Sequence, residues 1–464
     1  MFRWHPREQA VLALYALRWF CLAAPVGLIV GSACALFLWS LEKATDARLS
    51  HPGLLFLLPL AGVAIALLYE KLGRGSEGGN NLLLDEIHEP GGGVPRRMGL
   101  LVLVATVITH LFGGSAGREG TAVQMGGSVA AAVGRMLRLG PAEVRTLLLC
   151  GIAAGFGGVF GTPLTGAVFA MEVLAVGRMS YEAIIPCLIA AVLGDWTCGA
   201  WGVHHTRYAI SPGAIPTLAG EARFDWFLAA KVALASIAFG LASVLFAELI
   251  HGVQHLAKRI RWSWARPLVG GLCVVALTYA LGTRDYLGLG VSSPDPRAVT
   301  IVSSFSPDGA GAWSWWWKLL FTAITLGSGF KGGEVTPLFF VGATLGNTLG
   351  KLMHAPVDLF AGLGFVAIFA GATNTPLACT LMGIELFGAQ YTVYFMIACF
   401  LSYLFSGHSG IYTAQRVSIP KHELEELPQG ATLRSLREKR PSWALPFPGR
   451  GTNRREAQED VSHQ

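Results

Sequence analysis

The sequence predicts an all-α membrane protein that crosses the bilayer several times and is built from two repeated halves with interrupted helices. Three observations support this class: the composition, the recurrence of long apolar stretches, and an internal repeat. The chain has 464 residues, of which 53% are hydrophobic and only 14% are charged. Soluble domains contain about 25% charged residues, so the composition excludes an ordinary soluble fold.

Apolar stretches that reach or approach the roughly 20 residues needed to span a bilayer recur along the chain. They cover residues 12–41, 54–72, 98–112, 181–201, 227–256, 267–281, 313–326 and 393–405. The first stretch is too long for a signal peptide and lacks a clear small-residue cleavage site, so we expect it to remain as a span. Many of the 58 glycines lie inside apolar segments, where they permit close helix packing and broken helices.

Two blocks of sequence repeat in the same order. Residues 158–174 and 371–387 share a glycine, a Thr-Pro-Leu phrase and a glutamate (Glu172 and Glu385) at a constant offset of 213 residues. We expect these two glutamates to be structural. A glycine-carboxylate phrase also repeats about 215 residues apart, as Gly117-Arg118-Glu119-Gly120 and Gly332-Gly333-Glu334-Val335-Thr336-Pro337.

Repeated halves within one membrane domain commonly have inverted topology, with the substrate bound at the midplane where broken helices meet. We therefore expect residues 1–203 to form the first half and residues 224–418 the second. The polar segment 204–223 between them is expected to be an extramembrane loop.

Basic residues gather at the two ends of the chain. Arg3 and Arg7 precede the first apolar stretch, and these follow the last: Arg434, Arg437, Lys439, Arg440, Arg450, Arg454 and Arg455. By the positive-inside rule, both termini are expected to face the cytoplasm. Residues 419–464 are expected to form a basic cytoplasmic tail that is partly disordered. The positive-inside rule already explains these basic residues, so we expect no nucleic-acid partner.

The eight cysteines are scattered through apolar segments without disulfide or metal-ligand spacing, and the histidines also lack such spacing. We therefore expect neither a metal nor a cofactor. A membrane enzyme acting on lipid would need a nucleophile, base or metal set. The sequence offers none, so an enzyme is not expected.

Glycine-rich breaks before helix-compatible segments predict an anion pathway. They occur at residues 78–81, 117–120, 332–333 and 410–412. Moving a bare ion into hydrocarbon costs on the order of tens of kcal/mol. Free backbone N–H groups and the positive ends of helices offset this cost for an anion. Few basic side chains lie inside the apolar segments, so backbone amides are the expected donors.

Glu119 is the leading candidate for function. A charged side chain at membrane depth costs about 2.5–3.5 kcal/mol on insertion scales and suggests function by default. At a helix N-terminus its carboxylate would occupy the place of an anion, and protonation would release that place. Gly117, Arg118 and Gly120 complete this predicted anion site. The alternative is a helix-capping glutamate fixed by Arg118.

The second phrase supplies Glu334 and Thr336. Thr336-Pro337 suits a first helical turn, with threonine as the cap and proline in the first position. Either both residues only stabilise the helix terminus, or Glu334 is a second acidic group that takes the proton or couples it to the anion. Asn80 and Tyr412 are further candidate donors to the anion, although asparagine is also common in turns and tyrosine at membrane interfaces.

These phrases together resemble the CLC family of anion channels and proton-coupled anion antiporters. Gly117–Gly120 resembles the gating-glutamate motif of that family, and the repeated blocks around Pro163 and Pro376 resemble two of its later helices. Gly410-Ile411-Tyr412 is similar to its tyrosine-bearing final helix start. The resemblance covers about residues 10–418 and implies an inverted-repeat homodimer with one anion pathway per subunit.

Three departures from the common family pattern resemble its bacterial fluoride/proton antiporter branch. The usual early serine is absent from Gly79-Asn80-Asn81, Val173 stands where chloride antiporters carry a relay glutamate, and the second phrase contains Glu334 and Thr336. The resemblance implies that Glu119 is the gating glutamate, that Asn80 and Tyr412 line the anion site, and that Glu334 and Thr336 are the branch-specific pair. An ungapped comparison favours Asn80 over Asn81.

The expected function is therefore proton-coupled export of fluoride across a bacterial inner membrane, with fluoride and protons as the substrates. Fluoride is small and strongly hydrated, so binding it requires strong donors. It is also the base of a weak acid, so a protonated carboxyl can donate to it. A chloride/proton antiporter and a passive anion channel of the same fold remain open alternatives.

Overall fold

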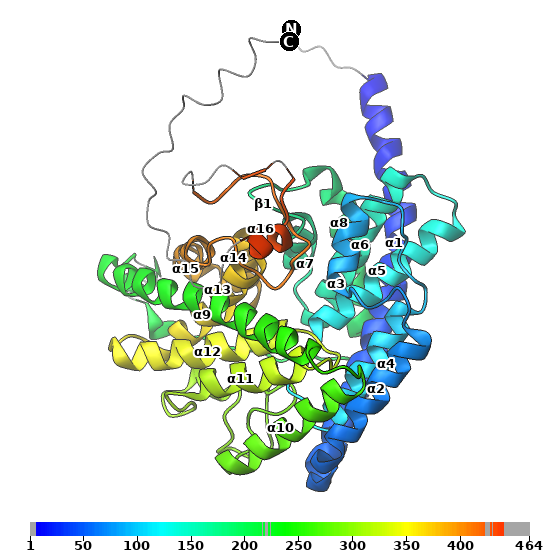
Figure 1. The fold of residues 1–464 in the computed structure, drawn as a ribbon. Coiled ribbons are helices and arrows are strands. Elements are labelled where there is room, and N and C mark those ends of the chain that lie inside the picture. Colours follow the sequence, from blue (N-terminus) through cyan, green and yellow to red (C-terminus); the bar gives the residue numbers. More distant parts are fainter. Residues whose placement is uncertain are drawn as a thin grey trace, which may run out of the picture.

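The computed structural model describes residues 6–215, 217–218, 221–222, 224–422, 427–428 and 430–439. Within them the chain is mostly helical (Figure 1). The helices are α1 (Pro6–Ser50), α2 (Leu58–Leu72), α3 (Asn80–His88), α4 (Met98–Leu111), α5 (Glu119–Met136), α6 (Pro141–Phe160), α7 (Pro163–Glu172), α8 (Ile184–Ala200), α9 (Trp226–Lys258), α10 (Ala265–Leu281), α11 (Ser314–Gly327), α12 (Val335–Leu352), α13 (Val357–Thr373), α14 (Pro376–Phe387), α15 (Thr392–Phe405) and α16 (Leu433–Lys439). The strands are β1 (Ala175–Val176), β2 (Thr217–Leu218), β3 (Glu221–Ala222) and β4 (Arg416–Val417).

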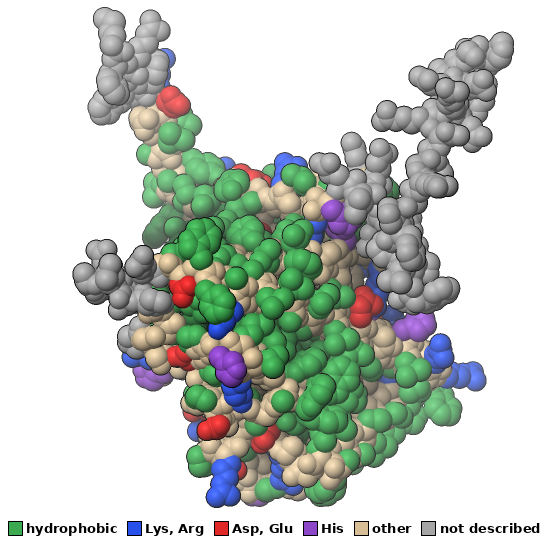
Figure 2. Space-filling view, turned by 90° about the vertical axis from the view of Figure 1, so that its left-hand side faces the viewer, with side chains coloured by type: hydrophobic (Ala, Val, Ile, Leu, Met, Phe, Trp, Pro, Cys, Tyr) green, Lys and Arg blue, Asp and Glu red, His purple; other side chains and the backbone are tan. Residues whose placement is uncertain are grey.

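Several helices are long and apolar enough to cross a membrane. In the described residues they are Arg7–Ser50, Pro52–Leu72, Pro141–Phe160, Tyr181–Ala200 and Trp226–Lys258. Shorter apolar helices accompany them, as the glycine-interrupted sequence predicted. Hydrophobic side chains cover much of the face in Figure 2, as expected for a surface in contact with lipid. The fold is a polytopic helical membrane fold.

The first eight helices lie on one side of the molecule and α9–α15 on the other (Figure 1). Glycines set the closest helix contacts in both groups. A Cβ on Gly126 of α5 would lie 2.0 Å from the carbonyl oxygen of Gly151 on α6. A Cβ on Gly342 of α12 would lie 2.1 Å from the carbonyl oxygen of Gly364 on α13. No side chain fits at either contact, so the repeat extends to helix packing.

Two glutamates join the repeated blocks. The carboxylate of Glu385 on α14 accepts hydrogen bonds from Leu164 N (2.9 Å), Thr165 N (2.8 Å) and Thr165 Oγ1 (2.6 Å), at the start of α7. Reciprocally, Glu172, the last residue of α7, accepts from the backbone amides of Leu377 and Ala378 at the start of α14. Each block therefore caps the N-terminus of the other, with the structural role that the sequence suggested.

The segment after the last span returns to the body of the protein. β4 pairs in parallel with β1, and Leu433 and Leu436 of α16 pack with Val176 and Val417. This contact was not predicted, because the basic composition of residues 419–464 favoured a partly disordered tail. Residues 423–426, 429 and 440–464 of that tail lie outside the described residues, as do 216, 219–220 and 223 of the predicted loop.

Candidate functional site

The two glycine-carboxylate phrases meet in space. Gly117 N donates to Gly333 O (2.6 Å), and Gly333 N donates to Gly117 O (2.8 Å), so the loops before α5 and α12 form one antiparallel bridge. A Cβ on Gly117 would lie 2.8 Å from Pro337 Cδ, and one on Gly333 would lie 2.8 Å from Gly120 N. Only glycine permits this approach, which brings the N-termini of α5 and α12 together.

Glu119, the first residue of α5, lies at this junction with 1% of its surface exposed. Its carboxylate accepts hydrogen bonds from Thr336 N (3.0 Å) and from Thr336 Oγ1 (2.6 Å to Oε2). Arg118 adds its backbone N–H (3.2 Å) and its Nε (3.4 Å). The carboxylate of one half therefore occupies the N-terminus of a helix from the other half, where an anion would be stabilised.

Thr336 does not have the position that the sequence suggested. α12 begins at Val335, with Glu334 in the N-cap position, so Thr336 is the second helical residue and Pro337 the third. The prediction that Thr336 is the cap and Pro337 the first helical residue is therefore wrong. Both donors of Thr336 are directed to Glu119 instead of to its own helix.

The side chains of Glu334 and Asn80 both lie close to Gly120. A Cβ on Gly120 would lie 3.0 Å from Asn80 Nδ2 and 3.5 Å from Glu334 Oε2. Both Glu334 Oε2 and Asn80 Oδ1 are buried without a hydrogen-bond partner. Unsatisfied buried oxygens are costly, so this position suits a proton, a water molecule or another mobile species.

The two asparagines have different surroundings. Asn80 and Tyr412 line one small cavity together with Phe169 and Val173. Asn81 Oδ1 instead accepts a hydrogen bond from Ala414 N (2.8 Å), so its side chain holds the segment that follows Tyr412. The structure thus brings Asn80, Tyr412, Glu334 and Gly120 to the neighbourhood of Glu119, and it leaves Asn81 in a structural contact.

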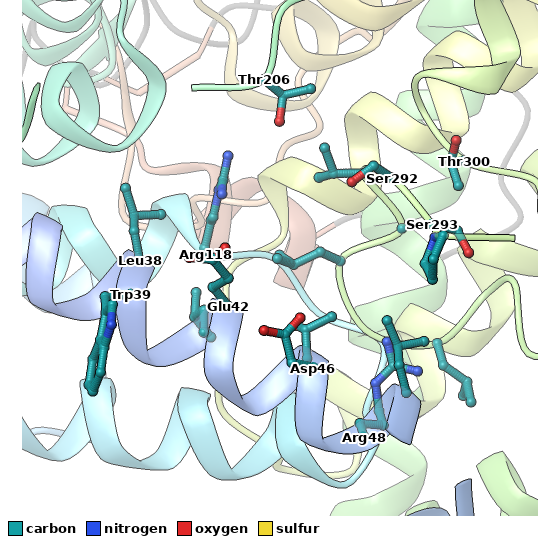
Figure 3. Close-up of a pocket in the computed structure, with 18 of the residues that line it drawn as sticks. Leu38, Trp39, Glu42, Asp46, Arg48, Arg118, Thr206, Ser292, Ser293 and Thr300 are labelled. Atoms are coloured by element: carbon teal, nitrogen blue, oxygen red, sulfur yellow. The ribbon is translucent and has the colours of Figure 1, made fainter. Parts of the chain in front are cut away.

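A larger cavity, here called the vestibule, lies beside the C-terminal half of α1 and has a volume of about 1210 Å³. Residues 201–206 and 284–300 form its other walls, and Arg118 lines it (Figure 3). Arg118 also donates hydrogen bonds to Glu119, so the wall of the vestibule includes a direct partner of the Glu119 carboxylate. The lining residues of the vestibule on α1 run from Ser32 to Leu49, so it lies toward the C-terminal end of that helix.

Sequence reasoning missed the side chain that supports this loop. His110 of α4 is buried and lies within hydrogen-bond distance of Thr106 O (2.8 Å) and of Ala116 O (3.0 Å), one residue before Gly117. The histidines were noted only for lacking metal-ligand spacing, and nothing in the spacing of His110 indicates which loop it contacts. Within the described residues, no group of three or more His, Cys, Asp or Glu side chains could hold a metal ion.

Comparisons with known proteins agree with this architecture. A family model described as "Voltage gated chloride channel" matches residues 61–407. The chain is 48% identical over 438 residues to a "Chloride/fluoride channel protein" of Pseudomonas syringae pv. tomato, covering 93% of each protein. It is 27% identical over 295 residues to the "H(+)/Cl(-) exchange transporter ClcA" of Vibrio vulnificus, covering 60% of this chain and 59% of the transporter.

Solved structures give the same result. The crystal structure of a CLC-type fluoride/proton antiporter superposes with a TM-score of 0.80 at 33% identity, covering 87% of this chain and 98% of that one. A slow cyanobacterial Cl⁻/H⁺ antiporter superposes with a TM-score of 0.70 at 19% identity, covering 85% of this chain and 96% of that one, which shows the shared fold alone. With its paired helix termini and repeated halves, this chain belongs to the CLC family of chloride and fluoride channels and antiporters.

Proposed function

We propose that this protein is a proton-coupled fluoride exporter, a fluoride/proton antiporter in which Glu119 is the gate. The observation that carries the proposal is the set of donors around the Glu119 carboxylate, above all Thr336 N and Thr336 Oγ1. An ionised Glu119 occupies these donors. A protonated Glu119 has lost its charge, so it yields them to an anion, and one side chain couples the two ions.

The choice of fluoride is supported by the residues near the gate. Glu334 provides a second carboxyl close to Gly120, whereas Val173, on the wall of the small cavity, provides none. Thr336, Asn80 and Tyr412 provide hydroxyl and amide donors. Arg118 and Gly120 provide backbone N–H groups at the start of α5, whereas the Gly117 N–H is donated to Gly333 O. The names of the Pseudomonas relative and of the fluoride/proton antiporter structure support the same choice.

The assembly and orientation belong to the proposal as well. We propose a homodimer in a bacterial inner membrane, with one pathway per subunit. Each subunit contains two inverted halves, residues 1–203 and 224–418, and both termini face the cytoplasm. The loop between α9 and α10 is basic, with Arg259 and Arg261, so by the positive-inside rule we expect it on the cytoplasmic side as well.

The test uses purified protein in liposomes, with fluoride and chloride efflux and proton movement recorded in parallel. We expect fluoride efflux to exceed chloride efflux and to drive protons in the opposite direction. Glu119→Gln and Glu334→Gln should each reduce coupled proton movement at least about tenfold, since a neutral amide cannot carry the proton. Glu182→Gln, at an exposed glutamate, is the matched control.

Other results would assign a different function. Equal or faster chloride efflux with proton movement would identify a chloride/proton antiporter, the activity named for the Vibrio relative. Fluoride efflux without any proton movement in the unmodified protein would identify a passive channel. Coupled transport that survives both Glu119→Gln and Glu334→Gln would refute the proposed roles of these residues.

A further inference from the structure

The turn between α9 and α10 is rich in basic side chains. Residues 258–266 include Lys258, Arg259, Arg261 and Arg266, and the chain has no aspartate or glutamate from residue 249 to residue 284. The first three of these side chains are exposed, whereas Arg266 is half-buried and donates to Ile260 O (3.2 Å). Because the three exposed cations lie within four consecutive residues, the chain itself keeps them close together.

Carboxylates near this turn are offset by other basic residues. Within the described residues, none of the four basic side chains has a carboxylate oxygen within 4.0 Å. Glu70, near the end of α2, contacts the turn by accepting a hydrogen bond from Ser263 Oγ (3.3 Å). The next residue of α2 is Lys71, also exposed, so the pair adds no net charge. On α9, Glu248 pairs with Arg437 (2.8 Å). The turn therefore keeps an excess of positive charge.

Two tryptophans lie next to these cations. The rings of Trp262 and Trp264 stack with their centroids 5.8 Å apart and their planes 12° apart. They are 60% and 38% exposed, and Leu256 on the last turn of α9 and Leu272 on α10 are exposed as well. Tryptophan is enriched at the membrane–water interface, where its ring lies at the level of the lipid headgroups. Apolar surface for acyl chains thus lies directly beside the cations.

The turn lies on the side of the membrane from which the chain starts. α1 and the segment Pro52–Leu72 are successive candidate spans, so the end of α2 returns to the side where α1 begins. The contact between Ser263 and Glu70 places the turn beside that end of α2 (Figure 1). In the orientation proposed above this is the cytoplasmic side, where anionic lipids give the membrane surface a negative potential.

We propose that the turn between α9 and α10 binds the phosphate of an anionic phospholipid, with Arg259 and Arg261 as the phosphate-binding side chains. Guanidinium groups match the geometry of phosphate oxygens, and Lys258 adds a further positive charge. The stacked tryptophans and the exposed leucines favour a lipid over a free phosphate ion, which has no apolar part. The proposal does not depend on which ion the protein transports.

The test measures the midpoint of thermal unfolding of the full-length protein in neutral detergent. A short-chain phosphatidylglycerol, or the phosphatidylcholine with the same chains, is added at increasing concentration. A ligand that binds only the folded state raises the midpoint, and the concentration required gives the affinity. We expect phosphatidylglycerol to raise the midpoint and phosphatidylcholine to leave it unchanged. Arg259→Gln combined with Arg261→Gln should weaken the affinity for phosphatidylglycerol about twentyfold, since each cation near an anionic lipid surface contributes about fivefold.

The matched control is Arg178→Gln combined with Arg297→Gln, at two exposed arginines in other loops. This control should bind phosphatidylglycerol as the unmodified protein does. Arg259→Lys combined with Arg261→Lys should lose less affinity than the glutamine pair, because the charge is kept. Trp262→Ala should also weaken the binding of phosphatidylglycerol. Sodium phosphate, at the same concentrations as the lipid, should leave the midpoint unchanged.

Three results would overturn the proposal. Equal effects of phosphatidylglycerol and phosphatidylcholine, or no effect of either, would show that the anionic headgroup is not recognised. An equal response to phosphatidylglycerol in the glutamine pair and in the control pair would place the lipid elsewhere on the protein. A midpoint raised as much by sodium phosphate as by phosphatidylglycerol would identify a site for free phosphate instead. Failure of the fluoride/proton antiport proposal would leave this measurement intact, since it does not depend on transport.

Discussion

Glu119 obtains its hydrogen bonds from both halves of the chain. Arg118 belongs to its own loop, and Thr336 belongs to the N-terminal turn of α12. Hydrogen bonds to a charged acceptor are worth about 1.5–3 kcal/mol each when the partner is removed. The position of the carboxylate therefore depends on a few identifiable donors, and each can be changed separately.

Thr336→Val tests the hydroxyl donor. Valine keeps the shape of the side chain and the backbone N–H but removes the Oγ1 contacts of 2.8 and 2.6 Å with Glu119. We expect fluoride transport to fall about tenfold or more, in line with the loss of one charge-assisted hydrogen bond. Thr336→Ser should retain at least about half of the rate, since it keeps the hydroxyl. Efflux from liposomes measures both, and equal rates for valine and serine would exclude a role of the hydroxyl.

Gly120→Ala tests the space between Asn80 and Glu334. The new Cβ would lie 3.0 Å from Asn80 Nδ2 and 3.2 Å from Gly333 Cα, so these groups must move apart. We expect slower fluoride efflux with an unchanged elution volume on size-exclusion chromatography. Gly199→Ala on α8 is the control, because its Cβ would meet nothing within 4 Å. An alanine at Gly120 as active as the control would show that this contact is unimportant for transport.

At the scale of helices, the ends are stabilised by partners distant in sequence. α7 has no side-chain cap of its own, and Glu385 supplies three hydrogen bonds from α14. Glu172 likewise accepts hydrogen bonds from two backbone amides at the start of α14. Loss of either glutamate therefore leaves backbone N–H donors at a helix N-terminus without a partner.

Glu385→Ala should therefore lower stability without altering the gate. We expect a loss of about 1–3 kcal/mol from the uncompensated donors at the start of α7, seen as a lower midpoint of thermal unfolding in detergent. Glu385→Gln, which keeps one acceptor oxygen, should lose less. Glu182→Ala serves as the exposed comparison. A melting temperature unchanged by Glu385→Ala would contradict the capping role.

At the scale of the whole molecule, the segment after α15 contacts helices of both halves. Arg416 pairs with Glu89 next to α3 (2.5 Å), and Arg437 pairs with Glu248 of α9 (2.8 Å). With Asn81 bonded to Ala414, this segment fixes α3, whose first residue is Asn80. Its packing should therefore influence the gate from a distance.

Leu433→Asp tests this link. The leucine is buried against Val176 and Val417, so a carboxylate there would release α16 from the body of the protein. We expect faster proteolysis of the C-terminal segment and slower fluoride transport. Glu438→Ala, at an exposed position of the same short helix, is the comparison. Unchanged proteolysis in Leu433→Asp would show that α16 is not held by this contact.

The sequence supports the class of fold and the location of the site but not the contacts within it. Periodic apolar stretches and a constant repeat offset predict spans and equivalent loops, because both depend on local pattern. That Thr336 would bond to Glu119, 217 residues earlier, depends on how the two halves pack. For the same reason the cap assignment of Thr336 was wrong, and the partners of Glu172, Glu385 and His110 had no signal in the chain.

The bridge between Gly117 and Gly333 restricts the kinds of motion available to a transport cycle. Two backbone hydrogen bonds join the halves at this contact, which leaves no room for a side chain. The contact lies next to Glu119, the proposed gate. A transport cycle in which one half moves as a rigid body relative to the other would have to break these two hydrogen bonds at every turnover. Access from each side of the membrane is therefore expected to alternate through swings of individual side chains, while the scaffold that carries them stays still.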